Sequence, residues 1–245
     1  MKTLFRVAGI PFPRPESLNE LYELGPSLMR LGRGLVVLSP ASTMPERPLE
    51  LYEFEGCPFC RKVRDTLTEL DLGYISRASG KNMDRSRLVA LGGKVQVPFL
   101  VDPNAGVSLY ESEDIIEHLH RTYGRSRPVW RRILAPLDTA NSALASAVRP
   151  RGNQVDARYV QRTQPERLLE LWSFEASPFC RKVREELTRL GLDYQVHNVG
   201  KRGRRRRELV ALGGKMQVPY LVDTNTGTEM YESDDIIAYL RATYG

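Results

Sequence analysis

The feature that most constrains this chain is an internal repeat. Residues 57–64, Cys-Pro-Phe-Cys-Arg-Lys-Val-Arg, return as residues 177–184, in which only the first cysteine is replaced, by Ser177. The similarity runs from 49–124 to 169–245, with identical residues at more than half of the positions and one residue inserted in the second copy. Each copy is long enough to form a small domain with its own core. We therefore expect two tandem domains at 49–124 and 169–245, an N-terminal extension at 1–48, and a linker at 125–168.

Hydrophobic periodicity predicts the same series of elements in both copies. Leu49 to Glu55 alternates apolar and polar residues, which is typical of a strand. Pro58 then suits the first turn of a helix, where a missing N–H costs no hydrogen bond. The order expected is strand 49–55, a helix from Pro58, a strand near Tyr74, a helix at 85–91 ended by Gly92-Gly93, strand 97–101, a turn at 102–106, strand 107–110, and a helix capped by Ser112. This βαβαββα order predicts an α/β fold.

The flanking segments are expected to contribute short helices and no further domain. One helix is predicted within Trp130–Val148, broken near Pro136, and another within Ser17–Leu31. Both segments are too short and irregular for a separate core.

Composition limits the class of protein and its compartment. Hydrophobic residues make up 41% and charged residues 27%, as in ordinary globular proteins. No apolar run is long enough to span a bilayer, and the N-terminus lacks the pattern of a secretory signal. A cytoplasmic location is therefore expected. Three cysteines are too few for a disulfide framework, so a Cys-x-x-Cys pair indicates redox or metal chemistry.

Metal and nucleic-acid binding are disfavoured by what surrounds these motifs. A zinc site needs about four ligands, and neither a second Cys-x-x-Cys nor a histidine pair at ligand spacing is present. The basic run 201–207 is interpreted as a solvated helix start, with an anion-binding edge as the alternative. Few aromatic residues lie within it, so no nucleic-acid partner is favoured. His118, His120 and His197 are expected on the surface or on helix faces.

Together these features resemble the thioredoxin-like N-terminal domain of glutathione S-transferases and glutaredoxins. The resemblance depends on the element order, on Cys-Pro-Phe-Cys after the first strand, on Val97-Pro98, and on Glu111-Ser112. The second copy carries Ser-Pro-Phe-Cys at 177–180, Val218-Pro219 and Glu232-Ser233 at the same places.

The resemblance implies a glutathione site in which each motif has a role. Cys57 is the expected nucleophile, because a helix N-terminus favours the thiolate, and Cys60 is the resolving thiol. Pro98 is expected to be cis, so that the backbone of Val97 pairs with the cysteinyl part of glutathione. Glu111 and Ser112 are expected at its γ-glutamyl end, and Lys94 and Gln96 at its glycyl carboxylate. The corresponding residues in the second copy are Ser177 and Cys180 for the chemistry, and Lys215, Gln217, Val218, Pro219, Glu232 and Ser233 for binding.

The departures from the family pattern leave several functions open. A glutathione transferase normally continues into an all-helical domain, and none is expected here. The favoured function is glutathione-dependent thiol–disulfide exchange or glutathione transfer at Cys57 and Cys60, on a small-molecule or protein-thiol substrate. The alternatives are a non-catalytic glutathione-binding scaffold, with the copies as an internal pseudo-dimer or the chain as a homodimer, and a glutathione-dependent isomerase. A glutathione-ligated iron–sulfur cluster bridging two chains is a further possibility.

Overall fold

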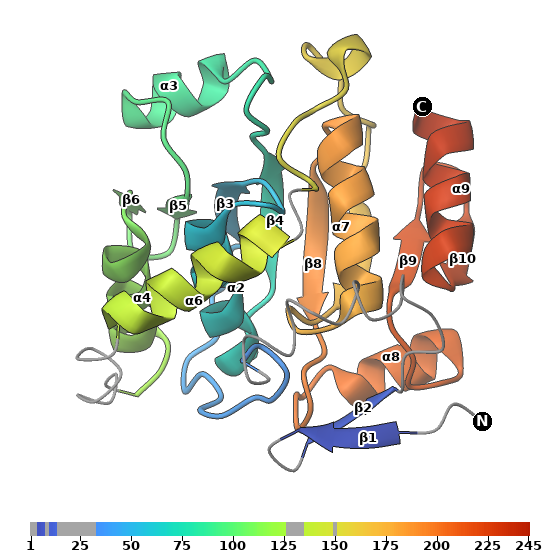
Figure 1. Ribbon diagram of the computed structural model, residues 1–245, viewed down its shortest axis with the longest axis horizontal. Helices are drawn as coiled ribbons and strands as arrows, with labels where there is room; N and C mark the ends of the chain where they lie inside the picture. Colours follow the sequence, from blue (N-terminus) through green and yellow to red (C-terminus); the bar gives the residue numbers. More distant parts are fainter. Residues whose placement is uncertain (1–3, 8–9, 14–32, 126–134, 149–150) are drawn as a thin grey trace.

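The computed structural model of the protein describes residues 4–7, 10–13, 33–125, 135–148 and 151–245 (Figure 1). Near the N-terminus, β1 (Leu4–Val7) and β2 (Ile10–Pro13) form a two-stranded antiparallel sheet, which the sequence did not predict. The helix predicted within Ser17–Leu31 lies outside the described residues.

Each repeat folds into the predicted βαβαββα order. The first module contains β3 (Leu49–Glu53), α2 (Pro58–Glu69), β4 (Tyr74–Ala78), α3 (Ser86–Gly92), β5 (Phe99–Asp102), β6 (Val107–Leu109) and α4 (Ser112–Thr122). The second contains β7 (Leu169–Ser173), α7 (Pro178–Leu190), β8 (Tyr194–Asn198), α8 (Arg206–Gly213), β9 (Tyr220–Asp223), β10 (Thr228–Tyr231) and α9 (Ser233–Tyr244). The chain is thus an α/β protein of two tandem thioredoxin-like modules.

Several predicted boundaries in the first module differ from the structure, and two of them involve the Val97-Pro98 and Glu111-Ser112 motifs. Strand β5 begins at Phe99, so Val97 and Pro98 precede it and leave its ladder complete. Ser112 does not cap α4, because the N-cap position is Glu111, whose side chain makes no capping hydrogen bond. A serine before two acidic residues resembles a cap in sequence, but the backbone enters this helix one residue earlier.

The two modules share one eight-stranded sheet, in the order β10-β9-β7-β8-β4-β3-β5-β6 (Figure 1). Their edge strands β4 and β8 pair antiparallel, with Ile75 opposite Gln195, the corresponding position of the second copy. The modules are therefore related by an approximate two-fold rotation about this pair. Each module also has parallel first and second strands, β3 with β4 and β7 with β8. It follows that the carboxyl ends of these strands, where the repeated Pro-Phe-Cys motifs begin, lie at opposite ends of the sheet.

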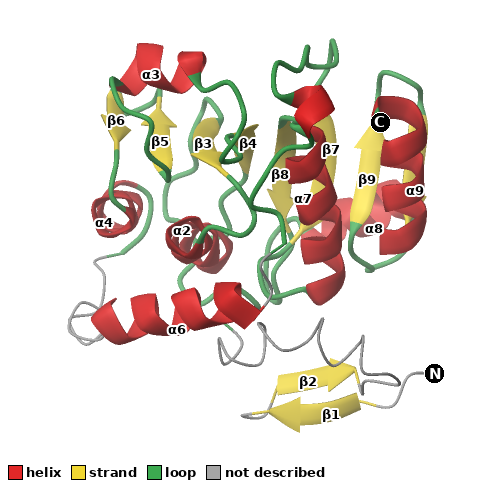
Figure 2. Cartoon of the chain, turned by 45° about the horizontal axis from the view of Figure 1, so that its top comes forward, coloured by secondary structure: helices red, strands yellow, loops and turns green. Residues whose placement is uncertain are grey.

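Alternating side chains divide each module between the two faces of the sheet. Helices α2, α4, α7 and α9 cover one face (Figure 2), where Leu51 and Leu171 join a core that is continuous across both modules. The next residue in each strand points the other way: Tyr52 packs with Leu88 of α3, and Trp172 with Leu209 of α8. The period of two in β-strands accounts for this separation.

The segment preceding each module binds the other module. The amide of Ala176 donates to the carbonyl of Gly34 (3.1 Å), and the equivalent amide of Gly56 donates to Gly152 (2.9 Å). Gly34 and Gly152 have φ of +69° and +70°, and a Cβ there would lie 2.7 Å and 2.9 Å from the Cβ atoms of Glu175 and Glu55. Glycine is therefore required at both crossings, and the two-fold relation extends to segments in which the sequence repeat is not apparent.

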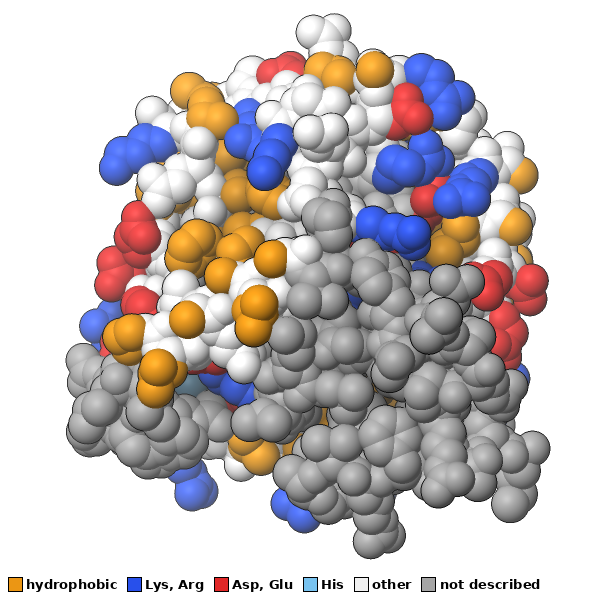
Figure 3. Space-filling model, viewed as in Figure 1, with side chains coloured by type: hydrophobic (Ala, Val, Ile, Leu, Met, Phe, Trp, Pro, Cys, Tyr) orange, Lys and Arg blue, Asp and Glu red, His pale blue; other side chains and the backbone are white. Residues whose placement is uncertain are grey.

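The linker contains a helix where one was predicted. Helix α6 spans Ala135–Val148, with Pro136 near the start of its described part. The part of the predicted helix before Ala135 lies outside the described residues. Helix α6 packs on α2, and the Ser142 hydroxyl donates to the Pro58 carbonyl (2.7 Å). Leu137 and Leu144 of this helix are more than half exposed. Hydrophobic side chains gather on the surface over α6 in Figure 3. A short 3-10 turn at Ala157–Tyr159 follows. Among the described residues, no helix has the length and apolar character to cross a membrane.

Candidate functional site

The two cysteines of the first module lie at the N-terminus of α2, both reduced. Cys57 is the N-cap residue, and the backbone N–H of Cys60 donates to its Sγ (3.2 Å). Hydrogen bonding from the Cys60 thiol, opposed by burial and aided by backbone N–H groups, lowers the pKa of Cys57 below its ordinary value. Burial raises the pKa of Cys60 well above its ordinary value, and the neighbouring Cys57 thiolate raises it further. The pair therefore divides into a thiolate-prone sulfur and a proton-retaining one, as a nucleophile and a resolving thiol require.

Of the three cations that follow Cys60, Arg64 is the one that contributes to this effect. Its charge lowers the pKa of Cys57, in addition to the helix-terminal hydrogen bonds. Lys62 instead contacts Glu113 of α4 and Thr139 of α6, on the far side of the helix. Arg61 faces Glu175 of the second module, at 3.6 Å.

The boundary at which β4 of the first module meets β8 of the second is called the seam here. Arg64 and its counterpart Arg184 bind carboxylates across this seam. Arg64 Nε donates to Glu175 (2.8 Å), and Arg184 Nε donates to Glu55 (2.8 Å). All four side chains are buried, and the pKa of Glu175 is lowered to about 2, because the attraction of the arginines outweighs burial. Within its own module, Arg64 also pairs with Glu53 (2.5 Å) and Glu55 (3.1 Å). Arg184 likewise pairs with Glu175 (2.9 Å) of its own module. Glu55 and Glu175 thus each pair with the arginines of both modules. The sequence shows these charges but not their pairing across the seam.

The second module repeats the backbone geometry without the nucleophile. Ser177 is the N-cap of α7, and its Oγ accepts from the N–H of Cys180 (3.2 Å). Burial raises the pKa of Cys180, and no other cysteine lies in this module. Serine keeps the capping hydrogen bond but supplies no thiolate. A dithiol cycle therefore cannot run in the second module.

The expected cis prolyl bonds are confirmed in both modules, at Val97-Pro98 and at Val218-Pro219. Val97 packs against the cluster of Phe54, Cys57 and Cys60, so the loop before β5 borders the thiols. The structure therefore places Val97 beside the thiols of Cys57 and Cys60.

Glu111 and Glu232 have an unusual backbone conformation. Their φ angles are 61° and 67°, in a region that residues other than glycine rarely adopt. A backbone conformation of this kind costs on the order of 1–3 kcal/mol. Each carboxylate accepts a hydrogen bond from a glutamine of the cis-proline loop, Gln96 and Gln217 respectively. Strain of this kind persists where the surrounding structure holds it and is concentrated at functional sites. The buried Ser112 and Ser233 follow directly, so both Glu-Ser pairs open a helix beside the cis-proline loop.

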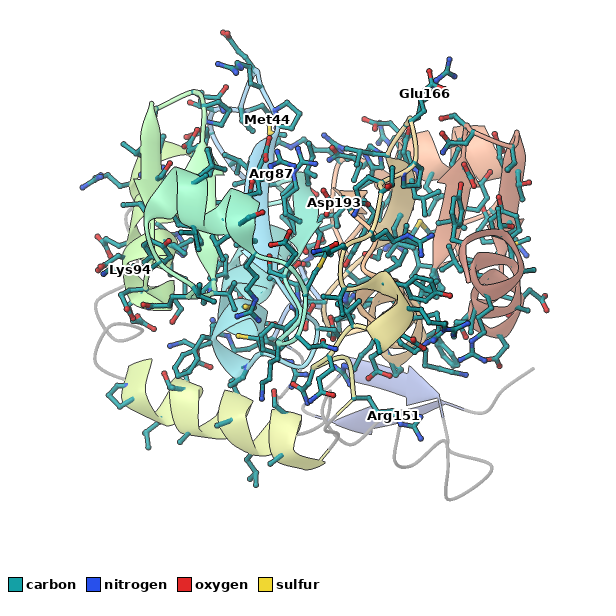
Figure 4. All side chains as sticks on the ribbon, turned by 90° about the horizontal axis from the view of Figure 1, so that it is seen from above. Met44, Arg87, Lys94, Arg151, Glu166 and Asp193 are labelled. Carbon is teal, nitrogen blue, oxygen red and sulfur yellow. The ribbon has the colours of Figure 1, made fainter. Side chains whose placement is uncertain are left out.

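Lys94 and Lys215 lie at equivalent places next to these loops. The ammonium of Lys94 sits over the Tyr110 ring, 5.6 Å from its centre, and that of Lys215 over Tyr231 at 4.4 Å. Figure 4 shows Lys94 at the outer side of the first module, away from the seam. Both cations are thus available beside the predicted binding loops.

The histidines lie partly where they were expected. His118 and His120 are on helix α4 but are buried, and His118 bonds Asp102 of β5 (2.8 Å). His197 lies in strand β8 instead, where it bonds Glu170 (2.8 Å).

The basic run 201–207 includes the start of α8, and Arg202, Arg204 and Arg207 are exposed, as a solvated helix start predicts. Part of the run also makes structural contacts. The Arg204 backbone N–H donates to Asp71 of the first module (2.8 Å), and the Arg205 guanidinium lies 2.6 Å from His197 Nδ1.

In the part of the chain that the structure describes, no group of three or more His, Cys, Asp or Glu side chains could hold a metal ion.

Comparison with known families and structures gives a consistent picture. The model of the glutathione S-transferase N-terminal domain matches residues 51–127 and 171–245, together more than half of the chain. No curated protein matches the sequence.

Solved structures similar to this chain include glutathione transferases and a glutaredoxin. A Bombyx mori glutathione transferase is 29% identical, with a TM-score of 0.31, over 38% of this chain and 47% of that one. Salmonella typhimurium glutaredoxin 2 in complex with glutathione is 24% identical, with a TM-score of 0.26, over 37% of this chain and 45% of that one. The trimeric Leishmania glutathione transferase is 14% identical, with a TM-score of 0.30, over 82% of this chain and 68% of that one. The present chain spans less than half the length of the first two structures.

Proposed function

Since the chain belongs to the family of glutathione S-transferase N-terminal domains and carries two of them in tandem, we propose that it binds glutathione and performs thiol chemistry in its first module. The observation that carries this proposal is Cys57 at the N-cap of α2, with its pKa lowered by the bond from Cys60. The proposed activity is glutathione-dependent thiol–disulfide exchange, or transfer of glutathione to an electrophile.

In the exchange reaction, the Cys57 thiolate attacks the glutathione sulfur of a mixed disulfide. A Cys57–glutathione disulfide forms, the original disulfide breaks, and the substrate leaves as a thiolate that takes a proton from water. Either Cys60, after losing its proton, or a second glutathione thiolate then attacks the new disulfide. With Cys60 the products are the Cys57–Cys60 disulfide and free glutathione; with glutathione they are free Cys57 and oxidised glutathione. The raised pKa of Cys60 favours the second route.

The remaining residues of the first module would orient glutathione. The Val97 backbone, next to the cis bond, would pair with the cysteinyl part and bring its sulfur to Cys57. Glu111 would accept from the γ-glutamyl ammonium, and the N-terminus of α4 at Ser112 would face its carboxylate. Lys94 and Gln96 would bind the glycyl carboxylate. Bound glutathione could instead be the nucleophile toward an electrophile whose leaving group departs as the carbon–sulfur bond forms.

In the second module, we propose glutathione binding without thiol exchange. Lys215, Gln217, Val218, Pro219, Glu232 and Ser233 repeat the binding positions. Ser177 would replace the thiolate with a hydroxyl that can donate to a glutathione sulfur, and Cys180 would remain inside the module.

A non-catalytic glutathione-binding scaffold is the second candidate, and one observation favours it. Cys57 is only 3% exposed, so its thiol is nearly covered in the ligand-free chain. An internal pair of modules on one continuous sheet would suit such a role.

The test is the glutathione-dependent reduction of a small mixed disulfide by the wild type and by Cys57→Ser. We expect the variant to lose about three orders of magnitude in kcat/KM, because its hydroxyl cannot form the mixed disulfide. Cys180→Ser is the matched control and should retain the wild-type rate, because its buried thiol is in the module without a nucleophile. Undiminished activity in Cys57→Ser would remove the first module from the mechanism and leave the scaffold.

A further inference from the structure

A pocket of about 480 Å³ lies at the seam between the modules, on the face of the sheet that carries α3. Its walls come from β3, β4, α3 and the loop before α3, from the linker residues 160–164, and from Asp193, which precedes β8. Figure 4 shows Arg87 of α3 and Asp193 of the second module close together here. The thiol of Cys57 and the loops proposed to bind glutathione are not among its walls.

Tyr52, a wall residue from β3, carries an unused hydrogen-bonding group. The residue is 3% exposed, and its Oη has no hydrogen-bond partner among the described residues. The ring is fixed by Phe99 (5.7 Å between centres) and by the guanidinium of Arg87 (5.8 Å). A buried hydroxyl without a partner is unfavourable, so its presence in a pocket wall suggests that a ligand supplies the missing bond.

A second unused donor reaches the same pocket from the linker. Nε of Arg162 is buried and has no hydrogen-bond partner within the described part of the chain. The guanidinium lies over the ring of Tyr159, 4.7 Å from its centre, and 6.0 Å from that of Tyr244. Aromatic contacts of this kind hold the cation in place but satisfy none of its N–H groups.

The charges around the pocket leave two guanidinium groups without a carboxylate. Arg77 pairs with Glu50 (2.8 Å) and Asp193 (3.0 Å), and Arg87 pairs with the same two carboxylates.

Arg85 instead donates to the carbonyls of Ser79 and Gly80. Within the described ranges, no carboxylate lies at ion-pair distance from Arg85 or Arg162. The wall contains four arginines, at positions 77, 85, 87 and 162, and two acidic residues, Asp84 and Asp193. Positive charge therefore predominates, and together with the Tyr52 hydroxyl it supplies the donors that an oxyanion requires.

A second pocket, which includes His197 and Gly73 at the positions equivalent to Arg77 and Asp193, has different chemistry. It has a volume of about 570 Å³ and is lined by Glu46, Glu170, His197 and Arg205, among others. His197 bonds Glu170 (2.8 Å) and Arg205, so these groups satisfy one another. Trp172 replaces Tyr52 and stacks on His197, and it does not line this pocket. The second pocket thus serves as an internal comparison.

We propose that the seam pocket of the first module binds a small molecule through a carboxylate or phosphate group, with Tyr52 Oη and Arg162 Nε as donors. The volume leaves room for a ligand larger than the oxyanion itself. This site is additional to the proposed glutathione sites and does not depend on them.

Calorimetric titration with inorganic phosphate and with succinate, at low ionic strength, tests the proposal. At least one anion should bind the wild type saturably at one site, and the preferred anion identifies the group that the pocket takes. Tyr52→Phe and Arg162→Gln should each weaken this binding by about tenfold or more. Arg205→Gln, in the second pocket, and Glu111→Ala, in the proposed glutathione site, should change it less than about twofold.

Thermal unfolding without ligand separates a binding role from a structural one. Tyr52→Phe should unfold at the same temperature as the wild type or higher, because it removes a buried hydroxyl that lacks a partner. A lower unfolding temperature for Tyr52→Phe would overturn the proposal. So would the absence of saturable binding of both anions, or equal binding by the wild type, Tyr52→Phe and Arg162→Gln.

Discussion

The two modules share a backbone and differ in chemistry. Both begin their first helix with an N-cap side chain bonded to the amide three residues on, both have the cis prolyl bond, and both hold a glutamate at positive φ. In the second module, however, an oxygen at Ser177 replaces the sulfur at Cys57. Capping needs only an acceptor, whereas exchange needs a nucleophile and a leaving group. The comparison shows that the fold preserves a site's geometry after its reactive atom has changed.

A second difference lies at the seam, in the buried arginine–glutamate pairs that connect the modules. Arg64 and Arg184 are each held by the other module's glutamate, but only Arg64 has a third carboxylate, Glu53, because Ser173 occupies that position in the second module. The arginine beside the thiol pair is thus the more fully neutralised one. Buried ion pairs therefore join the modules, and the arginine near the thiol pair is held partly by a carboxylate of the second module.

The largest effect on stability is expected from removing the shared carboxylate. Glu175→Gln should lower the free energy of unfolding by about 3–5 kcal/mol, because it leaves buried arginines uncompensated. Asp234→Asn is the control: Asp234 pairs with Lys182 at the surface, so the loss should stay below about 1 kcal/mol. Urea unfolding measures both, and a loss below about 1 kcal/mol for Glu175→Gln would contradict the account of the seam.

The same two proteins, the wild type and Glu175→Gln, should differ in how their stability changes at acid pH. The folded-state pKa of Glu175 is lowered from 4.5 to about 2, so its contribution is complete above pH 4.5 and is lost as the pH falls toward 2. Between these values the wild type should lose stability more steeply than Glu175→Gln.

A smaller effect is expected on glutathione affinity. Its measurement compares glutathione binding by the first module with binding by the second. If both do, calorimetry should find two sites in the wild type. Glu111→Ala and Glu232→Ala should each weaken one site by about ten- to a hundredfold, because each removes a charged hydrogen-bond acceptor.

A wild-type stoichiometry of one, lost only in Glu111→Ala, would show that the second module has lost its ligand as well as its thiol. No binding at all would contradict the proposed function.

Local features of the fold could be predicted from the sequence, whereas contacts across the seam could not. The stripe of Val63, Leu67 and Leu70 indicates α2, and Gly93 ends α3 in a left-handed conformation as expected. These outcomes depend on neighbouring residues and on backbone preferences. The pairing of β4 with β8 carries no such signal, because Ile75 and Gln195 resemble any residues of an edge strand.

The candidate site divides in the same way. Cys57, the cis bonds and the Glu-Ser pairs were found because short motifs mark them. The positive charge of Arg64 near Cys57 follows from its place in the helix, but its pairing with Glu175 of the second module does not. The unpartnered hydroxyl of Tyr52 was missed for a physical reason: a tyrosine in a strand usually belongs to the core. Tyr52 differs from an ordinary core tyrosine because its buried hydroxyl has no partner among the described residues. Arg64 differs from an ordinary helix arginine because it is buried and pairs with the other module.

The most direct test of the central claim is the thiolate pKa of Cys57, measured as the pH midpoint of its alkylation rate. The midpoint reports the thiolate pKa itself, whereas the absolute rate also depends on how easily the reagent reaches the sulfur. Cys60 and Cys180, in the same protein, provide the comparison, and mass spectrometry can follow the three thiols separately. We predict a midpoint for Cys57 below that of free cysteine, about 8.5, and midpoints above it for Cys60 and Cys180. A Cys57 that titrates like free cysteine or like Cys180 would contradict the claim that the first module alone has kept its nucleophile.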